Sequence, residues 1–397
     1  GENADVLSTL SFFNYISDLG LAAAIMQKKE VKSIDLNTVF IMQTVLSILA
    51  VVLGFALTPL ILNFYKDLPY SAVYLYWAVL VSFFFISFKT IPSLLLEKEI
   101  QIYKVVVAQI IENTVFYVIV IAMVFMGYDI EALIVAVLCR AVVGMVVIFF
   151  MRPWMPRWEF SWAAAKQLLT YGIPFQGNSF LALVKDDLLI LYLGGVIGFT
   201  NLGYVAFAKK YAEFSIRLIM DNVNRVAFPI FAKYNSEKPM LTKSVHKILF
   251  YDSIFVFPIV IGALFIFESL LHVIPKAGYF MKWEPALFSF YSFFVSLTSP
   301  FINLFNAVGN VKLSLKFMIL WTAFTWTVIP FAVSRWGYNG IAVSFFLQSL
   351  TFIFVYYQAK KYVDISLIKS IGLAAKSTFV MACYLGLLFI MLRRGTI

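Results

Sequence analysis

The chain has 397 residues, of which 62% are hydrophobic and 13% charged, and its mean hydropathy is +0.89. A soluble globular domain is closer to half apolar and a quarter charged. This composition therefore excludes a soluble globular protein and predicts a protein that crosses a membrane several times. The net charge of +10 does not indicate nucleic-acid binding, because the basic residues lie in short loops, where they set orientation and meet lipid headgroups.

Twelve apolar segments are long enough to span a membrane, which takes about 20 residues. They run over 5–27, 36–64, 73–96, 105–127, 130–151, 168–194, 203–229, 246–274, 285–308, 313–335, 338–359 and 370–392. Alternate loops carry seventeen Lys and Arg on one side and six on the other, a strong positive-inside signal that supports this number of spans. We therefore expect an all-α membrane protein of about 12 helices.

The segment 203–229 carries an unusual stripe of charges. Lys210, Glu213, Arg217, Asp221 and Arg225 are spaced by three, four, four and four residues, so they share roughly a third of a helix circumference. Each charge at a helix centre costs about 2.5–3.5 kcal/mol to insert, whereas an apolar residue returns only about 0.3–0.6 kcal/mol. The stripe therefore faces other charges as an ion-pair ladder, or it lines a water-filled transport cavity.

Other charges lie deep in predicted spans. Arg140 is in the middle of 130–151, where it either lines the cavity or pairs structurally. Lys185, Asp186 and Asp187 lie in 168–194, and the two aspartates point about 100° apart. One aspartate could pair with an arginine of the stripe, and the other could carry a proton or bind a cation; Glu213 is a further candidate for ion coupling.

For four other acidic residues, we expect a structural pair or hydration and no role in transport. Glu112 and Asp18 interrupt their spans and are expected to form buried pairs. Asp252 and Glu268 lie nearer span ends, where hydration is the simpler expectation.

A glycine-rich stretch joins the spans 168–194 and 203–229. We expect it to act as a hinge, built from Gly194, Gly195, Gly198 and Gly203, with Pro174 as a kink that neighbouring helices can accommodate.

The sequence contains neither a Walker A loop nor a zinc-protease or GxSxG motif, so no enzyme, cofactor or catalytic residue is predicted. The two cysteines and two histidines are too dispersed to predict a disulfide framework or metal site.

Six stretches of the sequence follow one another in a recognisable order: SDLGLAAAIMQKKE at 17–30, NFYKDL at 63–68, IPSLLLEKEIQIYK at 91–104, RPWMPRWEFSW at 152–162, LGGVIGFTNLGYVAFAKK at 193–210 and RVAFPIFAKYNSE at 225–237. In this order they resemble the polysaccharide flippase family, the Wzx-type oligosaccharide-lipid exporters of the MOP superfamily. Family members have one more span before the stretch that begins here, and often one after it, so we expect a chain cut at both ends.

The resemblance implies two pseudo-symmetric lobes around a central cavity, an N-terminal lobe over 1–157 and a C-terminal lobe over 158–397. It implies that undecaprenyl-pyrophosphate-linked oligosaccharide is flipped across a bacterial or archaeal cytoplasmic membrane, driven by an ion gradient. Lys210, Arg217 and Arg225 would meet pyrophosphate or acidic sugars, while Glu213 and Asp221 would weaken anion binding or take up a proton.

The resemblance also implies partners, namely membrane lipids and the polysaccharide polymerase and chain-length machinery. Two kinds of alternative remain open at the level of the sequence. One is another exporter of the superfamily, either for drugs and metabolites or for lipid II. The other is a membrane-embedded polymerase or glycosyltransferase, against which the short outer loops count.

Overall fold

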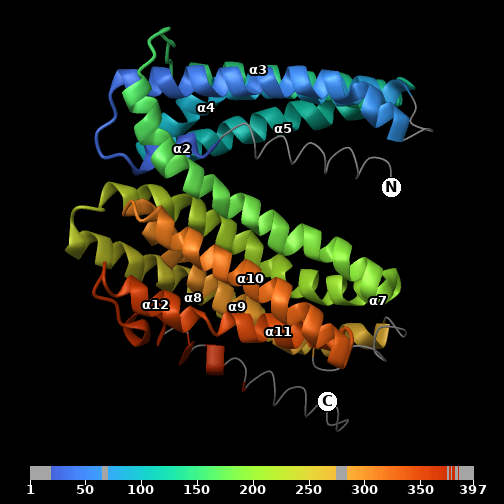
Figure 1. Cartoon of the computed structure of the whole chain (residues 1–397), viewed down its shortest axis with the longest axis vertical. Coiled ribbons are helices and arrows are strands. Elements are labelled where there is room, and N and C mark those ends of the chain that lie inside the picture. The colour runs from blue at the N-terminus through green and yellow to red at the C-terminus, as the bar shows by residue number, and fades with distance from the viewer. Residues whose placement is uncertain are drawn as a thin grey trace. The chain divides into compact units, whose positions relative to one another are not determined.

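The structure is a computed structural model that describes residues 19–64, 70–273 and 284–372, together with 375–376, 378–380 and 383. The described residues form α-helices and connecting turns, without a strand, and divide into two compact units (Figure 1). Unit 1 ends at Gln176 and contains α2 (Leu21–Gln27), α3 (Ser33–Phe64), α4 (Tyr70–Lys98), α5 (Ile102–Phe125), α6 (Ile130–Met151) and the start of α7 (Trp162–Lys233).

Unit 2 begins at Gly177 and contains the rest of α7, α8 (Lys238–Val273), α9 (Glu284–Ala307), α10 (Val311–Trp336), α11 (Asn339–Ser349) and α12 (Phe352–Ala359). The predicted lobes divide between residues 157 and 158, whereas the compact units divide within α7. The division into functional lobes therefore stays a prediction.

Eight stretches in the described helices are long and apolar enough to cross a membrane. They are Ser33–Pro59, Val73–Lys98, Ile102–Phe125, Ile130–Met151, Lys238–Gly262, Ala286–Ala307, Val311–Trp336 and Asn339–Ala359. Two more predicted spans, 168–194 and 203–229, form the two arms of α7, and the spans 5–27 and 370–392 lie mostly outside the described residues. The all-α membrane fold is confirmed, and an arrangement of two lobes around a central cavity stays a prediction.

The 72 residues of α7 form a helical hairpin rather than one rod. Gly198 leaves the helical conformation at φ 76° and ψ 154°, a left-handed backbone that glycine adopts without strain. Leu189 and Leu193 of the first arm share an apolar cluster with Val205 and Ala208 of the second, so the arms lie side by side (Figure 1). The predicted break between two helices therefore occurs at one glycine of the expected hinge.

The start of α7 belongs to unit 1 because it packs closely on the turn before α2. Gly20, with φ +68°, lies so close to Gly172 that a Cβ on Gly20 would collide with the Gly172 carbonyl, and a Cβ on Gly172 would collide with the Leu19 carbonyl oxygen. Lys28 adds a hydrogen bond from its Nζ to Gln167 Oε1 at 3.3 Å. Lys98 then fixes the end of α2, because its ammonium donates to the carbonyls of Ile25, Met26 and Lys28.

A buried ion pair joins two helices, α4 and α5, in the interior of unit 1. Lys89 Nζ of α4 lies 2.8 Å from Glu112 Oε2 of α5, and the Glu112 side chain is 6% exposed. Gly144 of α6 packs against this carboxylate, since a Cβ there would collide with it. The expectation of a buried pair is confirmed for Glu112, whereas Asp18 lies outside the described residues.

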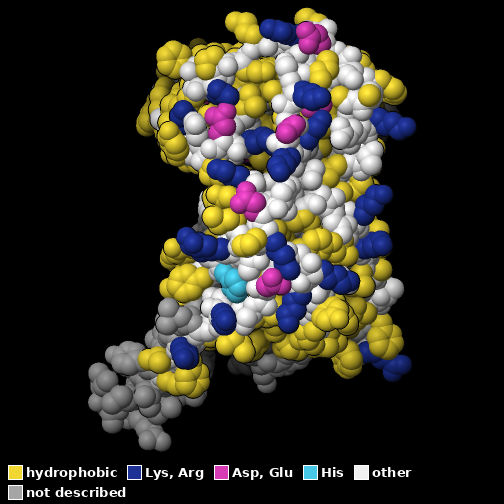
Figure 2. Space-filling view, turned by 90° about the vertical axis from the view of Figure 1, so that its left-hand side faces the viewer, with side chains coloured by type: hydrophobic (Ala, Val, Ile, Leu, Met, Phe, Trp, Pro, Cys, Tyr) yellow, Lys and Arg dark blue, Asp and Glu magenta, His cyan; other side chains and the backbone are white. Residues whose placement is uncertain are grey.

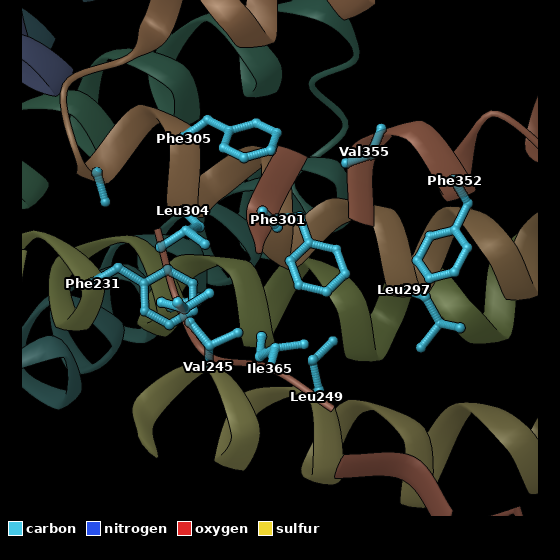
Figure 3. Packing of buried hydrophobic residues seen from close by; sticks show 14 of the residues in the cluster. Phe231, Val245, Leu249, Leu297, Phe301, Leu304, Phe305, Phe352, Val355 and Ile365 are labelled. Atoms are coloured by element: carbon cyan, nitrogen blue, oxygen red, sulfur yellow. The ribbon is translucent and has the colours of Figure 1, made fainter. Parts of the chain in front are cut away.

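Unit 2 is organised around α9, which contacts α8, α10, α11 and α12. Phe231, Leu249, Phe301, Phe305 and Phe352 belong to its larger apolar cluster, which we call the first core (Figure 3). In each unit, Lys and Arg side chains gather on the end of the helices that Figure 2 shows, as the positive-inside pattern predicts.

The environment of Asp252 differs from the one that we predicted. Its side chain in α8 is 0% exposed, so the prediction that it is hydrated near a span end is wrong. The predicted boundary was set by the apolar run alone, whereas α8 begins at Lys238 and places Asp252 about four turns inside. The side chain of Glu268 lies outside the described part of the structure.

The close contact between Gly20 and Gly172 predicts that adding one methyl group at Gly172 destabilises the protein. Gly172→Ala should lower the free energy of unfolding by about 1–3 kcal/mol, because the backbone of Leu19 and Gly20 must shift to admit the Cβ. The matched control is Gly262→Ala, since nothing lies within 4 Å of a Cβ there. Thermal unfolding in detergent measures both variants; equal melting temperatures would contradict the close contact.

The buried pair predicts a non-additive mutant cycle. Lys89→Met should destabilise the protein by about 3 kcal/mol, because it leaves the Glu112 carboxylate buried without its cation. Adding Glu112→Gln removes that charge, so the double variant should be more stable than Lys89→Met. The comparison is made by thermal unfolding of the four proteins, and strict additivity would argue against direct coupling.

Candidate functional site

Charged side chains meet between the two arms of the α7 hairpin, about three turns of helix away from the reversal at Gly198. Lys185 Nζ lies 2.8 Å from Asp186 Oδ1 on the first arm. Lys209 of the second arm lies 3.6 Å from the same oxygen and 3.7 Å from Glu213 Oε1, and Arg217 lies 3.2 Å from Glu213 Oε2. These five residues, which we call the charge cluster, contain three cations and two carboxylates and so carry one net positive charge.

Helical spacing explains the second-arm members. Lys209, Glu213 and Arg217 follow one another at intervals of four, so they lie on one face of the helix and alternate in sign. The Lys209 ammonium also lies 4.4 Å from the centroid of the Phe345 ring, a cation–π contact with α11. The cost of these charges inside a membrane is offset because each lies near an opposite charge.

The structure brings three of the predicted site residues together: Asp186, Glu213 and Arg217. Lys210 is exposed, and its neighbour Lys209 takes the place that the stripe assigned to it. The two lysines lie about 100° apart on the helix. The spacing could have identified Lys209, because Lys209, Glu213 and Arg217 follow one another at intervals of four residues, whereas Lys210 lies three residues before Glu213.

The remaining predicted residues lie outside the charge cluster. Asp187 and Asp221 are exposed, and Arg225 is half-buried. Arg140 is on α6 of unit 1, exposed, with its guanidinium 5.9 Å from the Phe116 ring centroid. Among the hinge candidates, Gly198 breaks the helix, while Gly194, Gly195, Gly203 and Pro174 are helical. Their roles in substrate binding, ion coupling and motion stay predictions.

A cavity of about 270 Å³ adjoins the charge cluster within unit 2. Its walls come from α7, α9, α10, α11 and the turn between α11 and α12: Ala182, Lys185, Asp186, Arg217, Met220, Tyr291, Val295, Thr298, Ser299, Ile302, Met318, Trp321, Gln348, Ser349 and Thr351. The Arg217 side chain is 61% exposed, so this guanidinium is accessible as well as paired.

Polar side chains on the other side of the cavity are held by hydrogen bonds. Gln348 Nε2 donates to Trp321 O at 2.8 Å and to Thr325 Oγ1 at 3.1 Å. Trp321 Nε1 donates to Thr351 Oγ1 at 2.8 Å. Gln348 and Thr351 flank the interruption between α11 and α12, where the predicted span 338–359 divides into two helices. Sequence reasoning missed Trp321 and Gln348, because neither carries a charge.

The cavity lies between two apolar clusters. The second core, which contains Leu193, Ala208, Ile329 and Phe345, lies on the side of the Gly198 reversal. The first core lies toward the opposite ends of the same helices. On the second arm of α7, on α10 and on the α11–α12 span, cavity residues fall between the positions that enter the two cores, whereas on α9 they alternate with residues of the first core. The polar chamber is therefore bordered by apolar packing.

The family model described as "Polysaccharide biosynthesis protein" matches residues 1–286. The chain belongs to this family. The chain is 22% identical over 303 residues to the teichuronic acid biosynthesis protein TuaB of Bacillus subtilis (strain 168), covering 76% of this chain and 59% of TuaB. It is 23% identical over 359 residues to the lipopolysaccharide biosynthesis protein WzxC of Escherichia coli (strain K12), covering 87% of this chain and 70% of WzxC.

The fold of this polysaccharide biosynthesis protein is similar to that of a multidrug resistance MATE family transporter of the MOP superfamily, solved in an outward-facing conformation. The TM-score is 0.65 at 14% identity, over 92% of this chain and 90% of that chain. At this identity the likeness shows the fold alone. The expected family and the multi-pass location in the cytoplasmic membrane are confirmed.

The adjacent lysines allow a matched test of the charge cluster. Lys209→Met should lower the free energy of unfolding by about 1–2 kcal/mol, because it removes a cation near two partly buried carboxylates. Lys210→Met should change it by less than about 0.5 kcal/mol, as is usual for an exposed position. Thermal unfolding of both variants checks this, and the reverse order would assign the paired position to Lys210.

Proposed function

We propose that this polysaccharide biosynthesis protein flips undecaprenyl-pyrophosphate-linked oligosaccharide, an O-antigen, capsule or exopolysaccharide repeat unit, across the cytoplasmic membrane. The observation that carries the proposal is the cavity within unit 2, which a charge cluster of net charge +1 adjoins. An ionic group inside a membrane is costly to insert, and it is typically found where an ionic substrate passes.

The chemistry of the cavity fits part of such a substrate. Arg217 presents an exposed guanidinium, which suits phosphate and carboxylate, and Lys185 adds a second cation. Trp321, Gln348 and Thr351 offer an aromatic face and polar groups of the kind that bind sugar rings. At about 270 Å³ the cavity is below the usual size for a drug-sized ligand, so it takes one charged or sugar group rather than a whole oligosaccharide.

The acidic members of the cluster have a separate role. Asp186 and Glu213 each pair with two cations, which lowers the attraction of the site for an anion. Substrate that binds in one leaflet must leave in the other, so moderate affinity favours turnover. We propose that an ion gradient drives this cycle by alternating access, with Gly198 and Pro174 as points of bending.

A second candidate function is export of drugs or metabolites, which rests on the likeness to a multidrug resistance transporter. The net positive charge of the cluster disfavours organic cations as substrates. A third candidate function, from another class, is that of a membrane-embedded polymerase or glycosyltransferase. Under the flippase proposal, the polymerase and the chain-length proteins are separate proteins that act as partners of this chain.

Complementation in a flippase-deficient bacterium tests the proposal. The intact, full-length protein should restore the matching surface polysaccharide. Arg217→Ala should lose most of it at equal membrane abundance, because the accessible guanidinium is gone. Lys210→Ala is the control at an exposed neighbouring position and should restore it like the parent.

Two results would overturn this assignment. If Arg217→Ala restored the polysaccharide fully, the cluster would be a structural ion-pair ladder. If the intact protein restored none in any matched host, and lipid-linked oligosaccharide did not accumulate on the inner side of the deficient strain, the exporter or polymerase assignments would take precedence.

A further inference from the structure

Asp252 is a buried carboxyl group that the charge cluster does not include. Its side chain is 0% exposed, and neither Oδ1 nor Oδ2 has a hydrogen-bond partner among the described residues. Asp252 lies in the middle of the core-facing side of α8, because Val245, Leu249, Asp252 and Val256 fall within about 60° of arc. The three apolar residues all belong to the first core.

Among the residues that the structure describes, the elements around this side of α8 supply no ionic partner for Asp252. The first core is formed with α7, α9, α10, α12 and the segment after α12. Within α9, residues 285–307 contain no Asp, Glu, Lys, Arg or His, and their one tyrosine, Tyr291, lines the cavity. On α12, the Tyr356 hydroxyl donates to Ile365 O at 3.3 Å.

The charged groups on these elements are paired with other residues, half-buried or exposed. His246 of α8 is hydrogen-bonded to Ser370, and Lys238 pairs with Asp364 at 3.1 Å. Arg225 is half-buried on the second arm of α7, where Asp221 is exposed and Lys233 lies over the Tyr234 ring. The other lysines are exposed: Lys243, Lys247, Lys312, Lys316, Lys360, Lys361 and Lys369.

An ionised carboxylate in such a place has lost its hydration and gained nothing in return, so the group is neutral in this conformation. Even a neutral acid carries polar atoms that go unsatisfied, and a leucine of similar volume would be more favourable there. A group that costs stability and is nevertheless buried in a membrane helix is a candidate for function.

We propose that Asp252 is a proton-binding site of this transporter, protonated in the conformation described and deprotonated when unit 2 opens to water. This inference rests on the proposed function, since it names the ion that couples to substrate movement and the residue that carries it. Asp186 and Glu213 are poorer candidates, because each already lies within ion-pair distance of two cations.

The surroundings select a proton rather than a metal cation. A sodium or calcium ion needs several oxygen ligands, and the described residues contain no group of three His, Cys, Asp or Glu that could hold a metal. The neighbours of Asp252 on its helix face are aliphatic. A proton needs a single oxygen, so Asp252 alone suffices.

The local helix offers a route for exchange. Pro258 lies six residues after Asp252 in α8 and leaves the carbonyl of Ile254 without its usual helical donor. Bending there would separate α8 from α9 beside the Phe257–Phe293 contact, whose ring centroids are 4.6 Å apart. Water entering this seam would reach the carboxyl group and let its proton leave.

The first test is infrared spectroscopy of the intact protein in lipid at neutral pH. Wild type should show the C=O stretch of a protonated carboxyl, and Asp252→Asn should lack it. Ser292→Ala, which removes a buried hydroxyl of α9 that also has no partner among the described residues, should retain the band. Persistence of the band in Asp252→Asn would overturn the proposal.

The second test separates coupling from structure. Asp252→Leu should raise the melting temperature, because it removes unsatisfied polar atoms, and should abolish restoration of surface polysaccharide at equal abundance. A variant that is more stable and still exports, or one that is less stable than wild type, would overturn the proposal. If the band disappears in Asp252→Asn although the intact protein restores no polysaccharide, the proton site stands and the flippase assignment fails.

Discussion

The structure of unit 2 depends on one constraint, which is that charges inside the membrane must meet opposite charges. Gly198 satisfies it by reversing α7, so that Asp186 on one arm comes within 3.6 Å of Lys209 on the other. Without the reversal, the second arm would carry a charged stripe that no lipid environment accommodates. The same pairing supports the cavity wall, because Lys185, Asp186 and Arg217 belong both to the cluster and to the lining.

Unit 1 meets the constraint differently. The Lys89–Glu112 pair joins α4 to α5, and a glycine of α6 packs against it, so the charges are enclosed by close packing. In unit 2 the charged groups adjoin a cavity instead, and Arg217 stays accessible. This difference between an enclosed pair and an accessible cluster is why the function is proposed at the cluster rather than at the ion pair of unit 1.

Much of the fold could be predicted from the sequence, because a membrane span needs a long apolar run and the loops carry a strong charge bias. The site was predicted in part. Glu213 and Arg217 stand out as charges in an apolar segment, but choosing Lys209 over Lys210 requires knowing which helix face meets the first arm. The prediction for Asp252 was wrong, since its burial depends on helices that are distant in sequence. The interruption after α11 has no proline or glycine to indicate it.

The two apolar cores that adjoin the cavity have a consequence for ion leakage through unit 2. If the protein acts as proposed, its ionic groups must not open a path for protons or salt between transport cycles. Each core is apolar and closely packed, and an ion that entered it would lose its hydration without finding a charged partner. The same packing that stabilises unit 2 would therefore also limit leakage through the polar chamber.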